Sequence, residues 1–181
     1  MGTFFTSDEH YFHNRIIELN NRPFSVEEMN DKLVEKFNAK VGENDTTYHL
    51  GDFTLGKAPP AIDILERLNG MHFFIKGNHD NRWLYDGFTH DKILAVKDYH
   101  ELKLDGQLMV MSHFPMLSWH HSYRGTFMLH GHCHAKLNDK NVGVRRLDVG
   151  VDSAYKILGD FVPFSFEEIR DLLVPSPSLD I

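Results

Sequence analysis

In the first half of the chain, short runs of apolar, β-branched and aromatic residues alternate with stretches in which apolar residues recur at helical spacing. The short runs, bounded by polar and turn-forming residues, predict strands at residues 3–7, 46–50 and 71–76. Helical spacing predicts a helix over residues 26–41 that opens with a capping box from Ser25 to Glu28. Its apolar positions are Val26, Met29, Leu33, Val34, Phe37 and Val41. A shorter amphipathic stretch predicts a second helix over residues 61–69, closed by Gly70, and the whole predicts a β-α-β-α-β order.

The second half contains a hairpin signal, two more strands and a final helix. Asp105-Gly106 separates two strand-like segments at residues 99–104 and 107–112, which predicts an antiparallel hairpin. Further strands are predicted at residues 127–130 and 147–151, and a capping box from Ser165 to Glu168 opens a helix that ends before Pro175. We therefore expect an antiparallel second half, helices on the outside of the sheets and a loose tail at residues 175–181.

Length and composition indicate one globular domain, placed at residues 1–174. The chain has 181 residues, 41% of them hydrophobic, within the range of a single core. No apolar run approaches the roughly 18 residues that span a bilayer, and the acidic N-terminus gives no sign of a signal sequence. Residues 1–6 match an N-myristoylation pattern, but residues 3–7 fit a buried strand better. The single cysteine, Cys133, suits a reducing cytoplasm, where we expect the protein without membrane association.

The net charge argues against one class of partner, and the histidine content favours another. The net charge is −7 and no basic cluster stands out, so we expect no stable binding of duplex nucleic acid. Histidine contributes 13 residues and is the commonest metal ligand in proteins. The composition therefore favours a metal site.

Potential metal ligands follow five of the predicted strands. Asp8 and His10 follow the first, Asp52 the second, and the tetrad Gly-Asn-His-Asp at residues 77–80 the third. His113 and the Gly-His-Cys-His segment at residues 131–134 follow two later strands. Ligands collect at the carboxyl ends of strands in α/β sheets, so we expect these segments to converge. A His-x-His pair is expected by chance about once in such a chain, but the tetrad only about once in two hundred chains.

These five blocks, in this order, resemble the signature of the calcineurin-like metallophosphoesterases, and look closest to the small cap-less bacterial and phage members. The resemblance runs from about residue 3 to about residue 173. It implies an α/β fold with a two-sheet β-sandwich flanked by helices, in four layers (αββα). It also implies two metal ions: one bound by Asp8, His10 and His134, the other by Asn78, His113 and His132, with Asp52 bridging both. Mixed oxygen and nitrogen ligands suit manganese first, with iron, zinc or nickel as alternatives.

The resemblance further implies a catalytic role for His79, which is not a ligand in the family pattern. It is suited to donate a proton to the leaving alkoxide, and we expect Asp80 to set its tautomer. The alternative, in which His79 only braces the loop, stays open. Cys133 is expected to point away from the metals, because His132 and His134 would share one face of an extended segment.

Substrate contacts are less sharply defined. The relatives' His-Phe-Gly-His stretch reads His-Tyr-Phe-His at residues 10–13 here, which leaves His13 and Arg15 as candidate substrate contacts. The segment 114–126, which contains Trp119, is expected to overhang the site, with Arg124 as a further candidate substrate contact. Its aromatic rings and guanidinium suit stacking on a base, but packing of the loop on the sheet edge is slightly favoured over that role. Arg145 and Arg146 could reach phosphate or face solvent. Five histidines are expected to be structural or on the surface: His49, His72, His90, His100 and His130.

These observations predict hydrolysis of a phosphoester, a phosphodiester in preference to a phosphomonoester, by water activated between two metal ions. The expected partner is a small phosphoester such as a nucleotide. Two alternatives are a non-catalytic metal-binding scaffold of the same fold and a nuclease. Retention of every ligand and of His79 argues against the scaffold, and the net charge of −7 argues against a long polyanion as partner.

Overall fold

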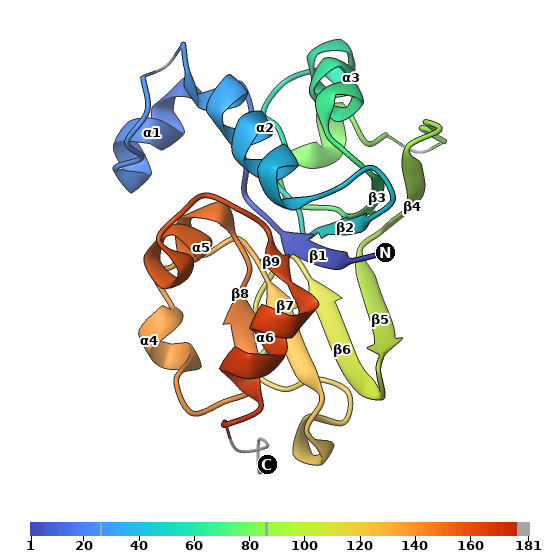
Figure 1. Ribbon diagram of the computed structural model, residues 1–181, viewed down its shortest axis with the longest axis vertical. Coiled ribbons are helices and arrows are strands. Elements are labelled where there is room, and N and C mark those ends of the chain that lie inside the picture. Colours follow the sequence, from blue (N-terminus) through green and yellow to red (C-terminus); the bar gives the residue numbers. More distant parts are fainter. Residues whose placement is uncertain (26, 86, 177–181) are drawn as a thin grey trace.

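The computed structural model describes residues 1–25, 27–85 and 87–176, and it places two sheets face to face with helices around them (Figure 1). The first sheet has the order β4-β3-β2-β1-β9 and the second β5-β6-β7-β8. The first consists of β1 (Thr3–Thr6), β2 (Thr46–His49), β3 (Met71–Ile75), β4 (Ile93–Lys97) and β9 (Phe164–Ser165). The second consists of β5 (Tyr99–Leu104), β6 (Gln107–Ser112), β7 (Phe127–His130) and β8 (Arg146–Asp148). The predicted two-sheet α/β fold is confirmed.

Strand directions are parallel over most of both sheets. Strands β1 to β4 run parallel, and only β9 is antiparallel in the first sheet. In the second sheet the predicted hairpin β5–β6 is antiparallel, but β6, β7 and β8 are parallel. The expectation of an antiparallel second half is therefore wrong beyond the hairpin. Parallel neighbours need a crossover of about a dozen residues or more, which residues 113–126 and 131–145 supply.

The helices confirm some predicted boundaries and move others. They are α1 (Asn14–Asn20), α2 (Met29–Lys40), α3 (Ala58–Arg67), α4 (Asn138–Asn141), α5 (Val151–Leu158) and α6 (Phe166–Leu173), with short 3-10 turns η1 (Asp80–Arg82) and η2 (Ser122–Arg124). Helix α6 begins with the predicted capping box, in which Ser165 Oγ accepts a bond from Glu168 N (3.2 Å).

The other capping box precedes its helix instead of opening it. Ser25 and Glu28 exchange the two predicted bonds, both 3.3 Å, but the helix starts only at Met29. Val26 lies outside the described residues, as do residues 177–181 of the expected tail. The strand predicted over residues 147–151 ends at Asp148, because Val151 already begins α5.

Hydrophobic side chains pack in three layers. Phe5, Met109 and Leu129 belong to the core between the two sheets, and α2 and α3 pack on the outer face of the first sheet through Leu33 and Leu65. On the outer face of the second sheet, Trp119 packs on Val110 and Met128. The segment 114–126 therefore packs on the second sheet, as one interpretation of this loop predicted, but on the outer face of the sheet and not at its edge.

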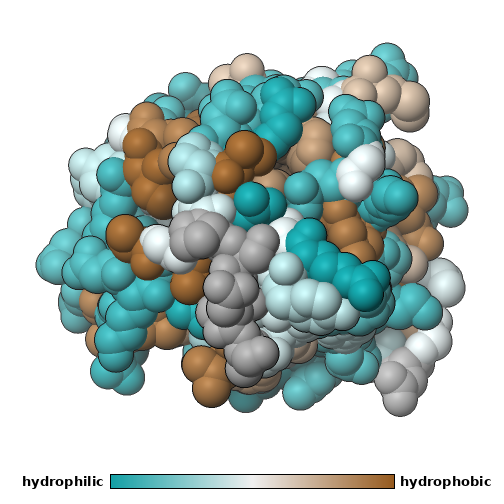
Figure 2. Space-filling model, turned by 90° about the horizontal axis from the view of Figure 1, so that it is seen from below, coloured by the Kyte–Doolittle hydropathy of each residue, from teal (hydrophilic) through white to brown (hydrophobic). Residues whose placement is uncertain are grey.

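The surface mixes hydrophobic and hydrophilic residues. No helix among the described residues is both long and apolar enough to cross a membrane. Seen from below, the end of the molecule that carries the β5–β6 turn shows hydrophobic patches separated by hydrophilic groups (Figure 2). This mixed end lies away from the carboxyl ends of β6, β7 and β8, where the candidate site is found.

Candidate metal centre

The segments that follow the strands converge where the two sheets meet. A parallel bridge between Ser7 and Gly150 joins the end of β1 to the segment after β8. Backbone bonds tie the segments together: Asp8 N donates to Gly51 O (2.9 Å), and Gly131 N donates to His113 O (3.0 Å). The predicted convergence at the carboxyl ends of strands is confirmed.

A first group of side chains contains Asp8, His10 and His134. One potential ligand atom of each lies within 4.8 Å of the others. Asp8 Oδ1 is 4.0 Å from His10 Nε2 and 3.8 Å from His134 Nε2. These are the three residues that the resemblance assigned to one metal ion.

A second group contains Asp52, His113 and His132, again within 4.8 Å of one another. Asn78 joins it, because its Oδ1 lies 3.1 Å from both His113 Nε2 and His132 Nδ1. Asp52 Oδ2 is 3.5 Å from His113 Nε2 and 3.7 Å from His10 Nε2 of the first group. Asp52 thus lies between the two groups, as a bridging carboxylate must.

The hydrogen bonding of the first group indicates a cation site independently of the family resemblance. Asp8 and His10 are buried, yet Asp8 Oδ1 and His10 Nε2 have no hydrogen-bond partner. Burial raises the pKa of Asp8 to about 7 and lowers that of His10 to about 2. Buried polar atoms without partners cost free energy, and a divalent cation between them would remove that cost.

Hydrogen bonds from Nδ1 orient the imidazoles of His113 and His134. His113 Nδ1 donates to Leu50 O (2.8 Å) and His134 Nδ1 donates to Asp152 Oδ2 (2.7 Å), which leaves each Nε2 directed at the site. Metal-ligating histidines typically donate their second ring N–H in this way. Burial opposes protonation of His113, but its hydrogen bond to Asp52 raises its pKa to about 9.

Arg22, which sequence reasoning missed, holds this arrangement together. Its Nε and Nη2 donate to the two Asp152 oxygens (2.9 and 3.0 Å), and Nη2 and Nη1 donate to the backbone carbonyls of Asp8 and Glu9 (2.7 Å each). Arg22 is only 4% exposed. It lies outside every motif block, and its only sequence signal is a position between two predicted elements.

The role expected for Asp80 needs correction. Its oxygens accept bonds from Gly77 N (2.8 Å), Asp52 N (2.8 Å), Phe53 N (3.1 Å) and Trp83 Nε1 (3.0 Å). Within the described part of the chain, no bond joins Asp80 to the His79 imidazole. Asp80 therefore fixes the backbone of two ligand loops and does not set the tautomer of His79.

His79 and His13 lie beside the candidate metal ligands in a cavity of about 200 Å³. His79 Nε2 is 3.9 Å from Asp52 Oδ2, and its side chain is 40% exposed. Arg15 is exposed and does not line this cavity. The residues that line it are His10, His13, Ile16, Leu19, Asn20, Asp52, Asn78, His79, His132, His134 and Lys136.

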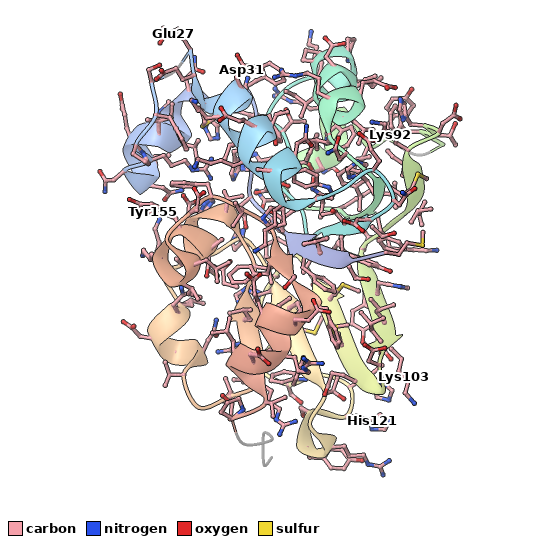
Figure 3. The ribbon with its side chains drawn as sticks, viewed as in Figure 1. Glu27, Asp31, Lys92, Lys103, His121 and Tyr155 are labelled. Atoms are coloured by element: carbon pink, nitrogen blue, oxygen red, sulfur yellow. The ribbon has the colours of Figure 1, made fainter. Side chains whose placement is uncertain are left out.

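The loop expected to overhang the site leads away from it instead. Because β6 and β7 are parallel, the connection starts at the carboxyl end of β6 and must return to the opposite end of the sheet. His113 is thus at the site, whereas Arg124 lines a hollow with Lys103 and Arg145 beside the β5–β6 turn. Figure 3 places Lys103 and His121 together at this lower end. Arg124 therefore does not lie where it could contact a substrate at the candidate metal ligands, and the base-stacking interpretation of this loop is wrong.

Cys133 belongs to neither candidate ligand group. The extended backbone from which we predicted this is, however, not present. His132 and His134 have left-handed φ angles of 68° and 47°, so the segment bends at both histidines and is not extended. Cys133 is half-buried. His49 and His72 are buried structural residues, linked in a chain from Glu9 Oε1 to His49 Nδ1 (2.7 Å) and from His49 Nε2 to His72 Nδ1 (3.0 Å).

The backbone at the ligands is unusual. Five of the seven ligand candidates have a left-handed φ between 47° and 68°: Asp8, His10, Asp52, His132 and His134. Two glycines allow these turns to approach one another. A Cβ on Gly131 would lie 1.9 Å from Ser7 Oγ, and one on Gly77 would lie 2.2 Å from Asp52 Oδ1.

Comparisons with known proteins agree with this geometry. An uncharacterized protein of Methanocaldococcus jannaschii is 32% identical over 170 residues, covering 92% of this chain and 88% of the relative. The Gene 66 protein of Mycobacterium phage L5 is 28% identical over 200 residues, covering 95% and 94%. A solved protein of unknown function from Aquifex aeolicus has the same fold, with a TM-score of 0.69 at 22% identity over 94% of this chain and 98% of its own. Residues 2–179 match the profile of the calcineurin-like phosphoesterases, a family of metal-dependent phosphoester hydrolases. The chain therefore belongs to the calcineurin-like phosphoesterase family.

Proposed function

We propose that this protein hydrolyses a phosphodiester with two divalent metal ions, manganese in the first place. The observation that carries the proposal is the meeting of two ligand groups at Asp52, whose Oδ2 is within 3.7 Å of a histidine nitrogen from each. Two bound divalent ions supply Lewis-acid charge and lower the pKa of water to near neutrality. The loops that follow the strands, together with the buried residues that fix them, would hold the ligand atoms for these two ions.

Charge in the cavity favours a diester over a monoester. Lys136 is the one lysine or arginine among the described residues that line the cavity. A phosphodiester carries one negative charge near neutral pH and a phosphomonoester close to two. With little cationic charge besides the metal ions, the cavity supports a monoanionic substrate better.

His79 is proposed to protonate the leaving alkoxide. It is the half-exposed histidine beside the bridging carboxylate, and its backbone N donates to Asp52 Oδ1 (2.9 Å), which fixes the loop that carries it. His13 lies in the same cavity, with Nδ1 3.4 Å from His10 Nδ1, and is proposed to contact the substrate. The proposed partner is a small phosphoester, and the proposed compartment is the cytoplasm, since the sequence contains one cysteine only.

The test measures initial rates on bis(4-nitrophenyl) phosphate and 4-nitrophenyl phosphate, with chelator-treated protein titrated with Mn²⁺. We expect no turnover without metal, restored turnover with two ions bound, and preference for the diester. His79→Ala should retain two ions and lose roughly 100-fold or more in kcat. His120→Ala is the matched control, because His120 pairs with Glu101 on the second sheet, outside the metal cavity.

The outcomes separate the alternatives. Full turnover by metal-free protein would refute the mechanism, and preference for the monoester would refute the charge argument. Two bound ions without turnover on either ester would favour the scaffold interpretation. A His79→Ala protein with unchanged kcat would assign His79 to bracing the loop.

A further inference from the structure

A second hollow adjoins the metal cavity. It has a volume of about 320 Å³ and shares four lining residues with that cavity: Leu19, Asn20, His134 and Lys136. The rest of its wall comes from Asn21 at the end of α1, from α5 through Asp152, Tyr155 and Lys156, and from Phe161 after α5. A substrate held at the metals can therefore extend past His134 into this hollow.

An aromatic ring forms part of the wall. The Tyr155 ring stacks on Phe161 with centroids 4.4 Å apart and planes at 15°, yet the residue is 44% exposed. One face of the ring is thus supported from behind while much of its surface stays open. Figure 3 shows Tyr155 at α5, next to α1. Leu19 of α1, also exposed, adds an apolar surface to the same hollow. Such a wall suits a planar ring, because aromatic side chains stack on nucleic-acid bases of any sequence.

The charge in the hollow is positive. Lys136 and Lys156 both line it, and neither forms an ion pair with any residue that the structure describes. Asp152 also lines the hollow, but its carboxylate already accepts bonds from Arg22 and His134. Two uncompensated lysines are unexpected beside the metal centre of a protein with net charge −7, and they suit an anionic group.

We propose that the hollow is a specificity subsite for a nucleoside phosphoester that carries a second phosphate. The base stacks on Tyr155, the second phosphate lies between Lys136 and Lys156, and the reacting phosphate lies at the metal ligands. The inference rests on the proposed function, because it assigns a substrate class to the same centre. It places base recognition at α5, not at the segment 114–126.

The experiment compares three 4-nitrophenyl esters with Mn²⁺ present: bis(4-nitrophenyl) phosphate, the ester of thymidine 5′-phosphate, and the same ester with an added 3′-phosphate. We expect KM to fall in that order. Tyr155→Ala should reduce the preference for the thymidine ester over the bis ester by roughly fivefold or more. Lys156→Ala should reduce the preference for the 3′-phosphorylated ester by roughly tenfold. In both cases the change should lie in KM and not in kcat.

Matched controls come from the other end of the molecule. Tyr123 is an exposed tyrosine and Lys103 an exposed lysine, and neither lines the metal cavity or the hollow. Tyr123→Ala and Lys103→Ala should keep both preferences. Their loss in these variants would show that the preferences do not arise in the hollow and would overturn the proposal.

Failure of the subsite and failure of the proposed function give different results. If the bis ester is hydrolysed but Tyr155→Ala and Lys156→Ala keep the wild-type preferences, the subsite is refuted and the proposed function stands. If no ester is hydrolysed, titration calorimetry with thymidine 3′,5′-bisphosphate tests the subsite alone. Weaker binding by Tyr155→Ala and Lys156→Ala than by wild type would support it, and equal or absent binding would overturn it.

Discussion

Replacing Arg22 by methionine should destabilise the protein by about 3–5 kcal/mol. The change removes a buried guanidinium that donates four bonds of 2.7 to 3.0 Å, two to Asp152 and two to backbone carbonyls. Removing one partner of a buried ion pair leaves the other charge uncompensated, which costs about 3–5 kcal/mol. The orphaned carbonyls add to that cost, whereas the methionine side chain recovers part of the lost packing. The expected loss is a large share of the roughly 5–15 kcal/mol of a typical domain.

Urea unfolding of the metal-free proteins measures this loss. Arg67→Met is the matched control, because the Arg67–Asp31 pair is exposed and such pairs contribute about 0–1 kcal/mol. Arg22→Lys keeps the charge without the planar fork and should fall between wild type and Arg22→Met. In a double-mutant cycle, Arg22→Met with Asp152→Leu should cost less than the two single changes together. A loss below about 1 kcal/mol for Arg22→Met would refute the reasoning.

The same variant should weaken metal binding. Asp152 orients His134 through a 2.7 Å bond to Nδ1, and Arg22 holds Asp152 in place. Loss of such a supporting contact typically lowers metal affinity by about 10–100-fold. Titration calorimetry with Mn²⁺ checks this at a temperature where Arg22→Met is still folded. Unchanged affinity would show that Arg22 acts on stability alone.

Three further changes test other parts of the structure. Gly131→Ala would bring a Cβ within 2.6 Å of Asp8 Oδ2, so it should bind fewer than two metal ions by elemental analysis; two ions at wild-type affinity would contradict the packing. Trp119→Ala removes a side chain that is 7% exposed and should cost about 3–5 kcal/mol in urea unfolding without changing KM for a bound phosphoester; a raised KM would restore the loop to the site. Burial raises the pKa of Glu9 from 4.5 to about 8, so its contribution to stability is complete below about pH 4.5 and is lost as the pH rises through about 8. Glu9→Gln should therefore flatten the fall in unfolding free energy of the metal-free protein between pH 5 and 8, and an unchanged slope would assign that fall to other groups.

Local sequence signals predicted most of the strands and helices and the residues of the two candidate ligand groups. The strands that end before Asp8, Asp52 and Asn78 each showed a short strand-forming run followed by a candidate metal ligand, so both the strand and its polar end were visible in the sequence. The capping box at Ser165 likewise placed α6. These features depend on residues close together in the chain, which sequence patterns record directly.

What escaped prediction depends on contacts distant in sequence. Arg22 donates to Asp152, which lies 130 positions away in the sequence, and no local pattern predicts that contact. Residues 113–126 start at the candidate metal site and lead to the opposite end of the strands, because β7 is parallel to β6. The misplacement of Arg124 followed from the wrong strand direction. Val151 looked like the end of a strand because apolar residues alternate from Leu147 through Val149 to Val151, although the chain turns into α5 there.

The left-handed backbone at five of the ligand positions links metal supply to the amount of intact protein. Asp and His tolerate this conformation better than most residues, but it still costs roughly 1–2 kcal/mol per residue. Without metal, that strain and the unpartnered Asp8 and His10 atoms weaken the loops they belong to. A ligand at 100 times its dissociation constant returns about 2.7 kcal/mol to the folded state. In a metal-starved cell the loops should open more often and expose the chain to proteases, so that the protein's lifetime, and not only its activity, follows the metal supply.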